Sequence, residues 1–299
     1  MQYQTSLLRG QPDDEAIKMI RYYEGLALEF DPRGYCVCTS EGKDSRVLGH
    51  LMRRAGVKHF YLHSITGIDP PELVYFQRQN FAEYEAQGYL TYDVMHEKSI
   101  FALMMEKLFP PLRSIRYCCE HLKEGNKPEQ GNAILCMGVR KFESTNRMKR
   151  RNELEIVMPK SKSNIIMPFD NDENRSTFES CYRDNQRHLN PIAYWRNEDI
   201  WEYSKDVGLE QCCLYQEGFP RLGCIGCPMA TAAEKAAEFA RWPKFKPLFI
   251  RALDRVIAER KRRGMPCYDN AGGAGADWFE WWISDKAQEI TDPDQMLIG

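Results

Sequence analysis

Apolar positions along the first 140 residues alternate between the spacing of helices and the spacing of strands. Helical spacing over residues 12–30 predicts an amphipathic helix, and a β-type run over 35–39 follows it. A second helical pattern covers 45–55 and ends at Gly56, since glycine commonly follows the last helical residue. A strand and a helix therefore meet at the polar stretch 40–45.

The same alternation continues after this first pair. The stretch 57–65 predicts a second strand, and prolines before residue 72 open the next helix, over 72–79. Another helix is expected over 99–108. The wholly apolar stretch 134–139 is typical of a strand buried on both faces of a parallel sheet. Strands that alternate with helices predict an α/β fold with a parallel sheet and helices on both faces.

Residues 148–187 interrupt this alternation of strands and helices, because they are polar and their apolar positions follow no sustained period. We expect a long excursion or flap there. Order resumes with a helix through Lys205, for which Asn197 is the expected N-cap. A cysteine-rich stretch and a helical region over 231–263 come next. The predicted division is a main domain over 1–210 and a helical, cysteine-rich extension over 211–299.

Composition adds limits to this picture. The 299 residues are 43% hydrophobic and 28% charged, with a net charge of −2, which argues against a surface coated with basic charge. No apolar run approaches the roughly 20 residues that cross a bilayer, and the first residues lack the pattern of a secretory signal. We therefore expect a cytoplasmic protein. Its eleven cysteines are expected as reduced thiols or metal ligands, with small buried roles for Cys36, Cys38, Cys136 and Cys181.

The polar turn at 40–45 is typical of anion binding. A glycine-containing loop that opens a helix exposes unpaired N–H groups, and the helix dipole favours negative charge there. Ser40 and Ser45 add hydroxyl donors, and Lys43 adds a positive charge. The spacing does not match the nucleotide P-loop. The simpler alternative is a polar loop with an incidental lysine.

Six stretches resemble one enzyme family. "SEGKDS" is similar to the Ser-Gly-Gly-x-Asp-Ser loop of the ATP pyrophosphatase (PP-loop) superfamily, which wraps the phosphates of an adenine nucleotide. The others resemble its phosphoadenosine phosphosulfate (PAPS) reductase branch, in the family's order. They are "TGIDPPELVYF" (66–76), "RYCCEHLK" (116–123), "GVRKFESTNR" (138–147), "PIAYWRNEDIWEY" (191–203) and "LYQEGFPRLGCIGCP" (214–228). The resemblance implies an adenine nucleotide alpha-hydrolase-like fold that binds its ligand at the carboxyl ends of the strands.

The resemblance also implies site residues. The loop would hold the nucleotide phosphates, two residues after the second strand would lie beside the nucleotide, and two arginines would face the anionic end of the substrate. Guanidinium groups suit phosphate or sulfate; the alternative for the pair is ordinary surface arginines. The residues are Ser40, Gly42, Lys43, Asp44 and Ser45 in the loop, Thr66 and Gly67 after the strand, and Arg140 and Arg147; of these, Lys43, Asp44, Arg140 and Arg147 are the catalytic candidates.

Glu41 stands where the family has glycine. A side chain in the left-handed conformation costs roughly 1–2 kcal/mol, and a carboxylate beside phosphates repels them. One hypothesis is that Glu41 helps to hold a Mg²⁺ ion that screens this charge, which would favour ATP as the substrate. The alternative is that its side chain points to solvent and only its backbone N–H is used.

Four thiols from two segments suit an iron–sulfur cluster or a zinc ion. They are Cys118 and Cys119 upstream, and Cys224 and Cys227 downstream. Because structural zinc more often uses two x₂-spaced pairs, the adjacent pair favours iron–sulfur. Relatives in the resembled family carry a [4Fe–4S] cluster on this pattern; free thiols are the alternative. Cys212 and Cys213 are close enough in sequence to compete as ligands, and Arg221 would lie beside cluster and substrate, or only at the rim.

The resemblance is incomplete at one point. Reductases of this family use a cysteine in a Glu-Cys-Gly-Ile/Leu-His segment, whereas Cys267 lies in "MPCYDN". We therefore expect ATP-dependent adenylation, with release of pyrophosphate, coupled to sulfur transfer. The alternatives are reduction of adenylyl sulfate (APS) or PAPS to sulfite by Cys267 or a partner's thiol, and a non-catalytic nucleotide-sensing subunit.

A basic stretch that overlaps the start of the flap is relevant to the sulfur acceptor. Residues 140–162 hold eight basic side chains against three acidic ones, a net charge of +5 in a chain of net −2. A nucleic-acid acceptor would explain this contrast, as would a solvated loop beside a phosphate-facing pair. A sulfur-donor protein is a further expected partner.

Overall fold

The computed structural model describes residues 12–125, 127–141, 154–157, 165–166, 186–265 and 272–284. The chain forms two compact units, each built from separate segments. The first comprises Met1–His63, Tyr75–Asp93 and Lys127–Arg221, and the second comprises Ser64–Val74, Val94–Asn126 and Leu222–Gly299. The cysteine segment after residue 222 thus shares its unit with two earlier segments. A family domain that ends at residue 210, with an extension after it, stays a prediction.

The first unit is built around a seven-stranded sheet with the order β3-β2-β1-β4-β7-β5-β6. β1 pairs in parallel with β2 and β4, and β4 pairs in parallel with β7. β5 pairs antiparallel with β7 and β6. The strands are β1 (Tyr35–Thr39), β2 (His59–Ile65), β3 (Thr91–Met95), β4 (Leu135–Met137), β5 (Leu154–Val157), β6 (Ile165–Ile166) and β7 (Gln186–Leu189). The predicted α/β class with a parallel sheet is confirmed.

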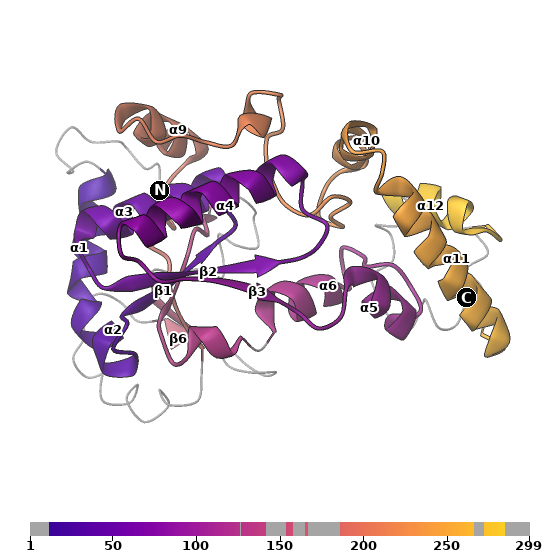
Figure 1. The fold of residues 1–299 in the computed structure, drawn as a ribbon, viewed down its shortest axis with the longest axis horizontal. Helices are drawn as coiled ribbons and strands as arrows, with labels where there is room; N and C mark the ends of the chain where they lie inside the picture. The colour runs from indigo at the N-terminus through magenta and orange to yellow at the C-terminus, as the bar shows by residue number, and fades with distance from the viewer. Residues whose placement is uncertain are drawn as a thin grey trace. The chain divides into compact units, whose positions relative to one another are not determined.

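Helices pack on this sheet through the apolar faces that the sequence pattern predicts. α3 (Lys43–Ala55) and α4 (Pro71–Ala86) lie over the same face in Figure 1. α3 buries Val47, Leu48 and Leu51 completely, and Gly56 ends it with φ +72°. The predicted helix over 12–30 is two helices, α1 (Pro12–Tyr22) and α2 (Glu24–Phe30).

The second unit is helical and has an aromatic core. Phe239 packs edge-on against Phe279 with ring centroids 4.8 Å apart, and Phe249 lies 4.9 Å from Trp282. The indole N–H of Trp282 donates to the carbonyl of Pro111 at 2.8 Å. The helices are α5 (Ile100–Lys107), α6 (Tyr117–Cys119), the π-helical turn η1 (Glu120–Glu124), α10 (Ala232–Arg241), α11 (Lys246–Arg262) and α12 (Gly275–Ile283).

Two local predictions need correction. The stretch 148–187 is not without regular structure, because β5 and β6 lie inside it and extend the sheet. Asn197 is the first residue of α9 (Asn197–Asp206), not its N-cap. Arg196 is the N-cap, and its backbone N–H donates to Asp199 at 2.5 Å. An acidic residue in the first turn thus accepts the backbone N–H of the N-cap.

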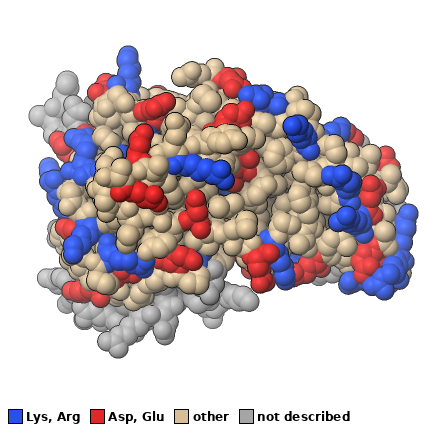
Figure 2. Space-filling view, in the orientation of Figure 1, with Lys and Arg blue, Asp and Glu red and all other residues tan. Residues whose placement is uncertain are grey.

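The surface of the described residues has no single sign of charge on the face shown in Figure 2, where Lys and Arg are interspersed with Asp and Glu. Within the described ranges, none of the helices has the length and apolar character needed to span a bilayer.

Candidate functional site

The strand order of the first unit locates a ligand site. The chain adds β2 and β3 on one side of β1 and β4 and β7 on the other, so the order reverses between β1 and β4. In open parallel sheets, ligands bind outside the carboxyl ends of the strands at such a reversal. Residues 40–45 follow β1, and Arg140 follows β4. The predicted loop and one predicted arginine therefore meet at the expected edge.

The loop exposes the start of α3. Gly42 is the N-cap, with an extended backbone (φ −74°, ψ 163°), and α3 begins at Lys43. The Ser45 hydroxyl donates to the Gly42 carbonyl at 3.0 Å and accepts the Ser40 N–H at 3.3 Å, which fixes the turn. Gly138 packs directly on it: a Cβ there would stand 2.9 Å from the Ser45 nitrogen. The loop thus has a defined backbone with N–H groups at a helix N-terminus.

Two cations meet at the loop through one carboxylate. Arg140 donates to one oxygen of Asp44 at 2.7 Å, and the ammonium of Lys43 lies 3.2 Å from the other. Lys43 and Arg140 are only 6% and 4% exposed, whereas the Asp44 side chain is 18% exposed. Lys43 and Arg140 thus share one carboxylate beside the helix start. This arrangement suits an anion with several oxygens.

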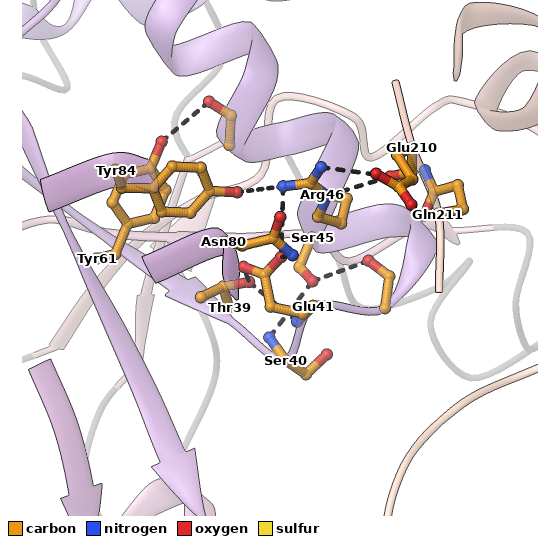
Figure 3. A network of polar contacts seen from close by, with 12 residues as sticks. Thr39, Ser40, Glu41, Ser45, Arg46, Tyr61, Asn80, Tyr84, Glu210 and Gln211 are labelled. Atoms are coloured by element: carbon orange, nitrogen blue, oxygen red, sulfur yellow. Dashed lines mark hydrogen bonds and ion pairs between the residues drawn. The ribbon is translucent and has the colours of Figure 1, made fainter. Parts of the chain in front are cut away.

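Glu41 occupies neither of its expected environments. It has the left-handed backbone anticipated for this position, with φ +52°, but its side chain is 1% exposed. Thr39 donates to one carboxylate oxygen at 2.8 Å, and Asn80 donates to the other at 2.9 Å (Figure 3). Arg46 lies 3.6 Å from the second oxygen. The solvent-facing alternative is wrong, and the internal bonds of both oxygens do not favour a metal-ligand role.

Arg46 connects this buried carboxylate to its surroundings. It donates to the Tyr84 hydroxyl at 2.5 Å and to the Glu210 carbonyl at 3.3 and 3.4 Å (Figure 3). Burial raises the pKa of Glu41, and the charge of Arg46 acts in the opposite direction. Sequence reasoning missed Asn80 and Arg46, because neither lies in the polar turn.

Tyr215 is a second loop residue that sequence reasoning missed. Its hydroxyl accepts the backbone N–H of Lys43 at 2.8 Å, and its ring lies 5.9 Å from the Lys43 ammonium. Burial raises its pKa, so the phenol is protonated at neutral pH. Tyr215 lies within the recognisable stretch 214–228, but nothing in its spacing relates it to the loop.

The second unit brings the four predicted cysteines to one cavity. Cys118 and Cys119 come from α6, and Cys224 and Cys227 come from a tight turn in which the Cys227 N–H donates to the Cys224 carbonyl at 3.2 Å. Gly226 between them has φ +72°, and a Cβ there would meet Trp282 at 2.8 Å, so glycine is required. The cavity lining also includes Thr66 and Lys123.

The four thiols differ in acidity. Cys118 donates a hydrogen bond to Cys119, which lowers the pKa of Cys119 to about 6 and raises that of Cys118. Burial raises the pKa of Cys224 to about 11. The Thr66 hydroxyl lies 3.5 Å from the Cys224 sulfur and donates to Asp69 at 2.6 Å. Thr66 is thus a neighbour of the cysteine cavity, and its predicted contact with the nucleotide stays a prediction.

The donor set of the cavity consists of four thiols. In the described part of the chain, no three His, Cys, Asp or Glu side chains are close enough to hold one metal ion. Thiolates are the ligands of iron–sulfur clusters and of many structural zinc sites. The chemistry of the cavity residues therefore suits such a group, and the group that they hold stays a prediction.

Other predicted residues lie apart or cannot be placed. Cys212 and Cys213 belong to the first unit and do not line the cavity, and Arg221 is exposed at the end of that unit. Gly67 has φ +77°. The residues outside the described ranges include Arg147, Cys181 and Cys267, and the stretch 142–185 apart from β5 and β6. Cys36 and Cys136 are fully buried as expected, whereas Cys38 is half-buried.

Comparisons with known proteins identify the family of the chain. A family model described as "Phosphoadenosine phosphosulfate reductase domain" matches residues 34–230. The Xylella fastidiosa phosphoadenosine 5'-phosphosulfate reductase is 24% identical over 221 residues, which cover 74% of this chain and 83% of that protein. The matched range includes the loop and all four cavity cysteines.

Two further similarities are more limited. The adenosine 5'-phosphosulfate reductase of Oceanobacillus iheyensis is 35% identical over 52 residues, which span 17% of this chain and 22% of that protein. The crystal structure of a PAPS reductase from Candida auris, a phosphate complex, aligns with a TM-score of 0.45 and 14% identity, over 73% of this chain and 90% of that one.

Proposed function

The chain belongs to the phosphoadenosine phosphosulfate reductase family, and we propose that it adenylates an acceptor with ATP, releases pyrophosphate and then transfers sulfur to the acceptor. The observation that carries the nucleotide assignment is the pair of buried cations, Lys43 and Arg140, held by Asp44 beside the N-terminus of α3. Two cations and several N–H groups directed at one place suit the charge of a triphosphate.

The reaction begins when an oxygen of the acceptor attacks the α-phosphorus of ATP. The bond from this phosphorus to the bridging oxygen breaks, and pyrophosphate leaves with Mg²⁺. A sulfur nucleophile then attacks the activated carbon of the acceptor, and AMP leaves with the original oxygen. Lys43 and Arg140 stabilise the negative charge that develops on the phosphate oxygens. Asp44 holds both cations in position.

The cysteine cavity would hold a [4Fe–4S] cluster on Cys118, Cys119, Cys224 and Cys227. Held by all four thiolates, such a cluster would give structural support, whereas held by only three of them it would leave one iron able to bind the incoming sulfur. Of these thiols, Cys119 has a pKa below its usual range, which favours its thiolate form. Serine at any one of the four positions is expected to lower the iron content and the absorbance near 400 nm of anaerobically purified protein.

A second function, the reduction of APS or PAPS to sulfite, is favoured by the family and by the similarity to APS reductase. This reaction needs a thiolate that attacks sulfur. Among the described residues of the second unit, all four cysteines line the cavity. The attacking thiol that we propose for this second function is Cys267 or a thiol of a partner protein.

The acceptor that we propose is a nucleic acid. Its support is the net charge of +5 over residues 140–162, which differs from the mixed charge of the face in Figure 2. A separate sulfur-donor protein is the corresponding proposal for the second substrate. A nucleotide-sensing subunit is the third alternative, and it predicts binding without turnover.

One experiment separates these functions. The protein is incubated anaerobically with ATP and Mg²⁺, with APS or with PAPS, in the presence and absence of a mixed nucleic-acid acceptor and a thiol reductant. Pyrophosphate release that depends on the acceptor supports adenylation. Sulfite supports reduction and would overturn the first proposal. Tight nucleotide binding without either product identifies a sensing role.

A matched pair of variants tests whether the reaction takes place at the loop. Lys43→Met removes a charged contact to phosphate, which is worth about 1.5–3 kcal/mol, and is expected to lower kcat/KM at least about 10-fold. Lys205→Met removes an exposed lysine from α9 of the same unit and is expected to leave activity unchanged. Equal activity of both variants would separate the reaction from this loop.

A further inference from the structure

Tyr215 lies at the point of the loop where a phosphate oxygen would bind. Its hydroxyl oxygen accepts the N–H of Lys43, the first residue of α3. The oxygen would be 3.4 Å from a Cβ at Gly42, so it lies directly on the N-cap. An N–H group at this position is one of those that bind anions at helix N-termini. In this structure it is already satisfied by a phenol.

The hydroxyl accepts a hydrogen bond, and no residue within the described ranges accepts its proton. The side chain is held in place by its neighbours, since its ring lies edge-on to Trp201 with centroids 5.1 Å apart. It belongs to the short turn η4 (Cys213–Tyr215), which is anchored by the fully buried Leu214. The free O–H is therefore positioned before any ligand binds.

The charges around the hydroxyl show what it faces. Asp44 and Arg140 both act on its titration, and Lys43 lies beside its ring. Burial keeps the phenol protonated, because it raises its pKa. A neutral O–H group next to two cations can donate to an anion without adding negative charge to the site.

We propose that Tyr215 is a substrate-binding residue, whose hydroxyl accepts the Lys43 N–H and donates its own proton to a phosphate oxygen of the bound nucleotide. The phenol extends the reach of the helix N-terminus by one hydrogen bond and positions the phosphate between Lys43 and Arg140. This inference rests on the proposed nucleotide function of the loop. Tyr215 comes from the segment before the Cys-x-x-Cys turn. The binding of phosphate would therefore also depend on the position of that segment.

The test is nucleotide binding by Tyr215→Phe, which keeps the ring and removes the hydroxyl. Equilibrium dialysis with ATP and Mg²⁺, pyrophosphate and adenosine is performed on the full chain. A hydrogen bond to a charged group corresponds to at least about a 10-fold loss of affinity, expected for ATP and pyrophosphate but not for adenosine. Trp201→Phe, which changes the packing of the ring but keeps the hydroxyl, is the matched control and is expected to bind ATP within about threefold of the wild type.

Each outcome decides the proposal. If Tyr215→Phe binds ATP as tightly as the wild type, or more tightly, the hydroxyl is not a donor to phosphate and the inference is wrong. If the wild type binds neither ATP nor pyrophosphate, the proposed function of the loop fails, and this inference fails with it. Should Tyr215→Phe not fold, a fluorotyrosine at position 215 replaces it. Its more acidic phenol is expected to tighten binding of pyrophosphate, and unchanged or weaker binding would overturn the proposal.

Discussion

Replacement of Glu41 tests how the loop is held. This carboxylate is buried, accepts hydrogen bonds from Thr39 and Asn80, and lies 3.6 Å from Arg46. Glu41→Ala leaves the two donors without an acceptor and Arg46 without its counter-charge. Removal of one partner from a buried charged pair costs about 3–5 kcal/mol. We expect a loss of that size in the free energy of unfolding.

Two further variants divide this loss into its causes. Glu41→Gly loses the same contacts but removes the side chain from a backbone with φ +52°, which recovers roughly 1–2 kcal/mol. Glu41→Gln keeps the shape and an acceptor for Thr39, but it loses the charge and the acceptor for Asn80, so its cost is about 1–3 kcal/mol. The expected order of stability is wild type, Gln, Gly, Ala.

Urea unfolding measures this series, with the denaturant slope checked for constancy. The Mg²⁺ dependence of nucleotide turnover is expected to be the same in Glu41→Gly and the wild type, because both oxygens of the carboxylate are bonded inside the protein. An alanine variant as stable as the wild type would refute the role of the buried network. Alanine more stable than glycine would refute the backbone argument.

Two more predictions concern the frame of the site. Burial lowers the pKa of His59 to about 4, so the unfolded chain takes up a proton below about pH 6.5 that the folded chain does not, and stability is lost as the pH falls from 6.5 to 4. Full protonation would cost about 3 kcal/mol. Urea unfolding at pH 7 and at pH 4.5 should show a smaller loss of the free energy of unfolding for His59→Gln than for the wild type. An equal loss in both proteins would contradict the lowered pKa of His59. Gly138→Ala places a Cβ 2.9 Å from the Ser45 nitrogen and is expected to weaken ATP binding, measured by dialysis. Gly25→Ala is the control, because open space surrounds this glycine, and it is expected to bind ATP normally. Equal affinities of the two variants would show that the loop tolerates the added methyl group.

The sequence pattern was sufficient to predict the strand and the helix on either side of the loop. β1 has the predicted bounds, and α3 begins two residues before the predicted start, because Lys43 and Asp44 are polar and do not extend the apolar pattern. β3 was not predicted, since its residues are buried only in part and lack the alternation of a half-buried strand. β7 was hidden at the end of the polar stretch 148–187.

The residues of the candidate site were likewise predicted only in part. Lys43 and Arg140 were expected from motifs, and the strand order brings them together. The partners Asn80 and Tyr215 were not expected, because α4 and the turn before the Cys-x-x-Cys segment reach the loop only through the fold. Contacts such as these depend on tertiary packing and have no local spacing that reveals them.

The most direct test of the central claim is a crystal structure with a non-hydrolysable ATP analogue and Mg²⁺ at saturating concentration. We predict phosphate oxygens within hydrogen-bond distance of the N–H groups of Gly42, Asp44 and Ser45, of the Lys43 ammonium and of the Arg140 guanidinium. A nucleotide bound away from the turn between β1 and α3, or none bound at all, would contradict the account.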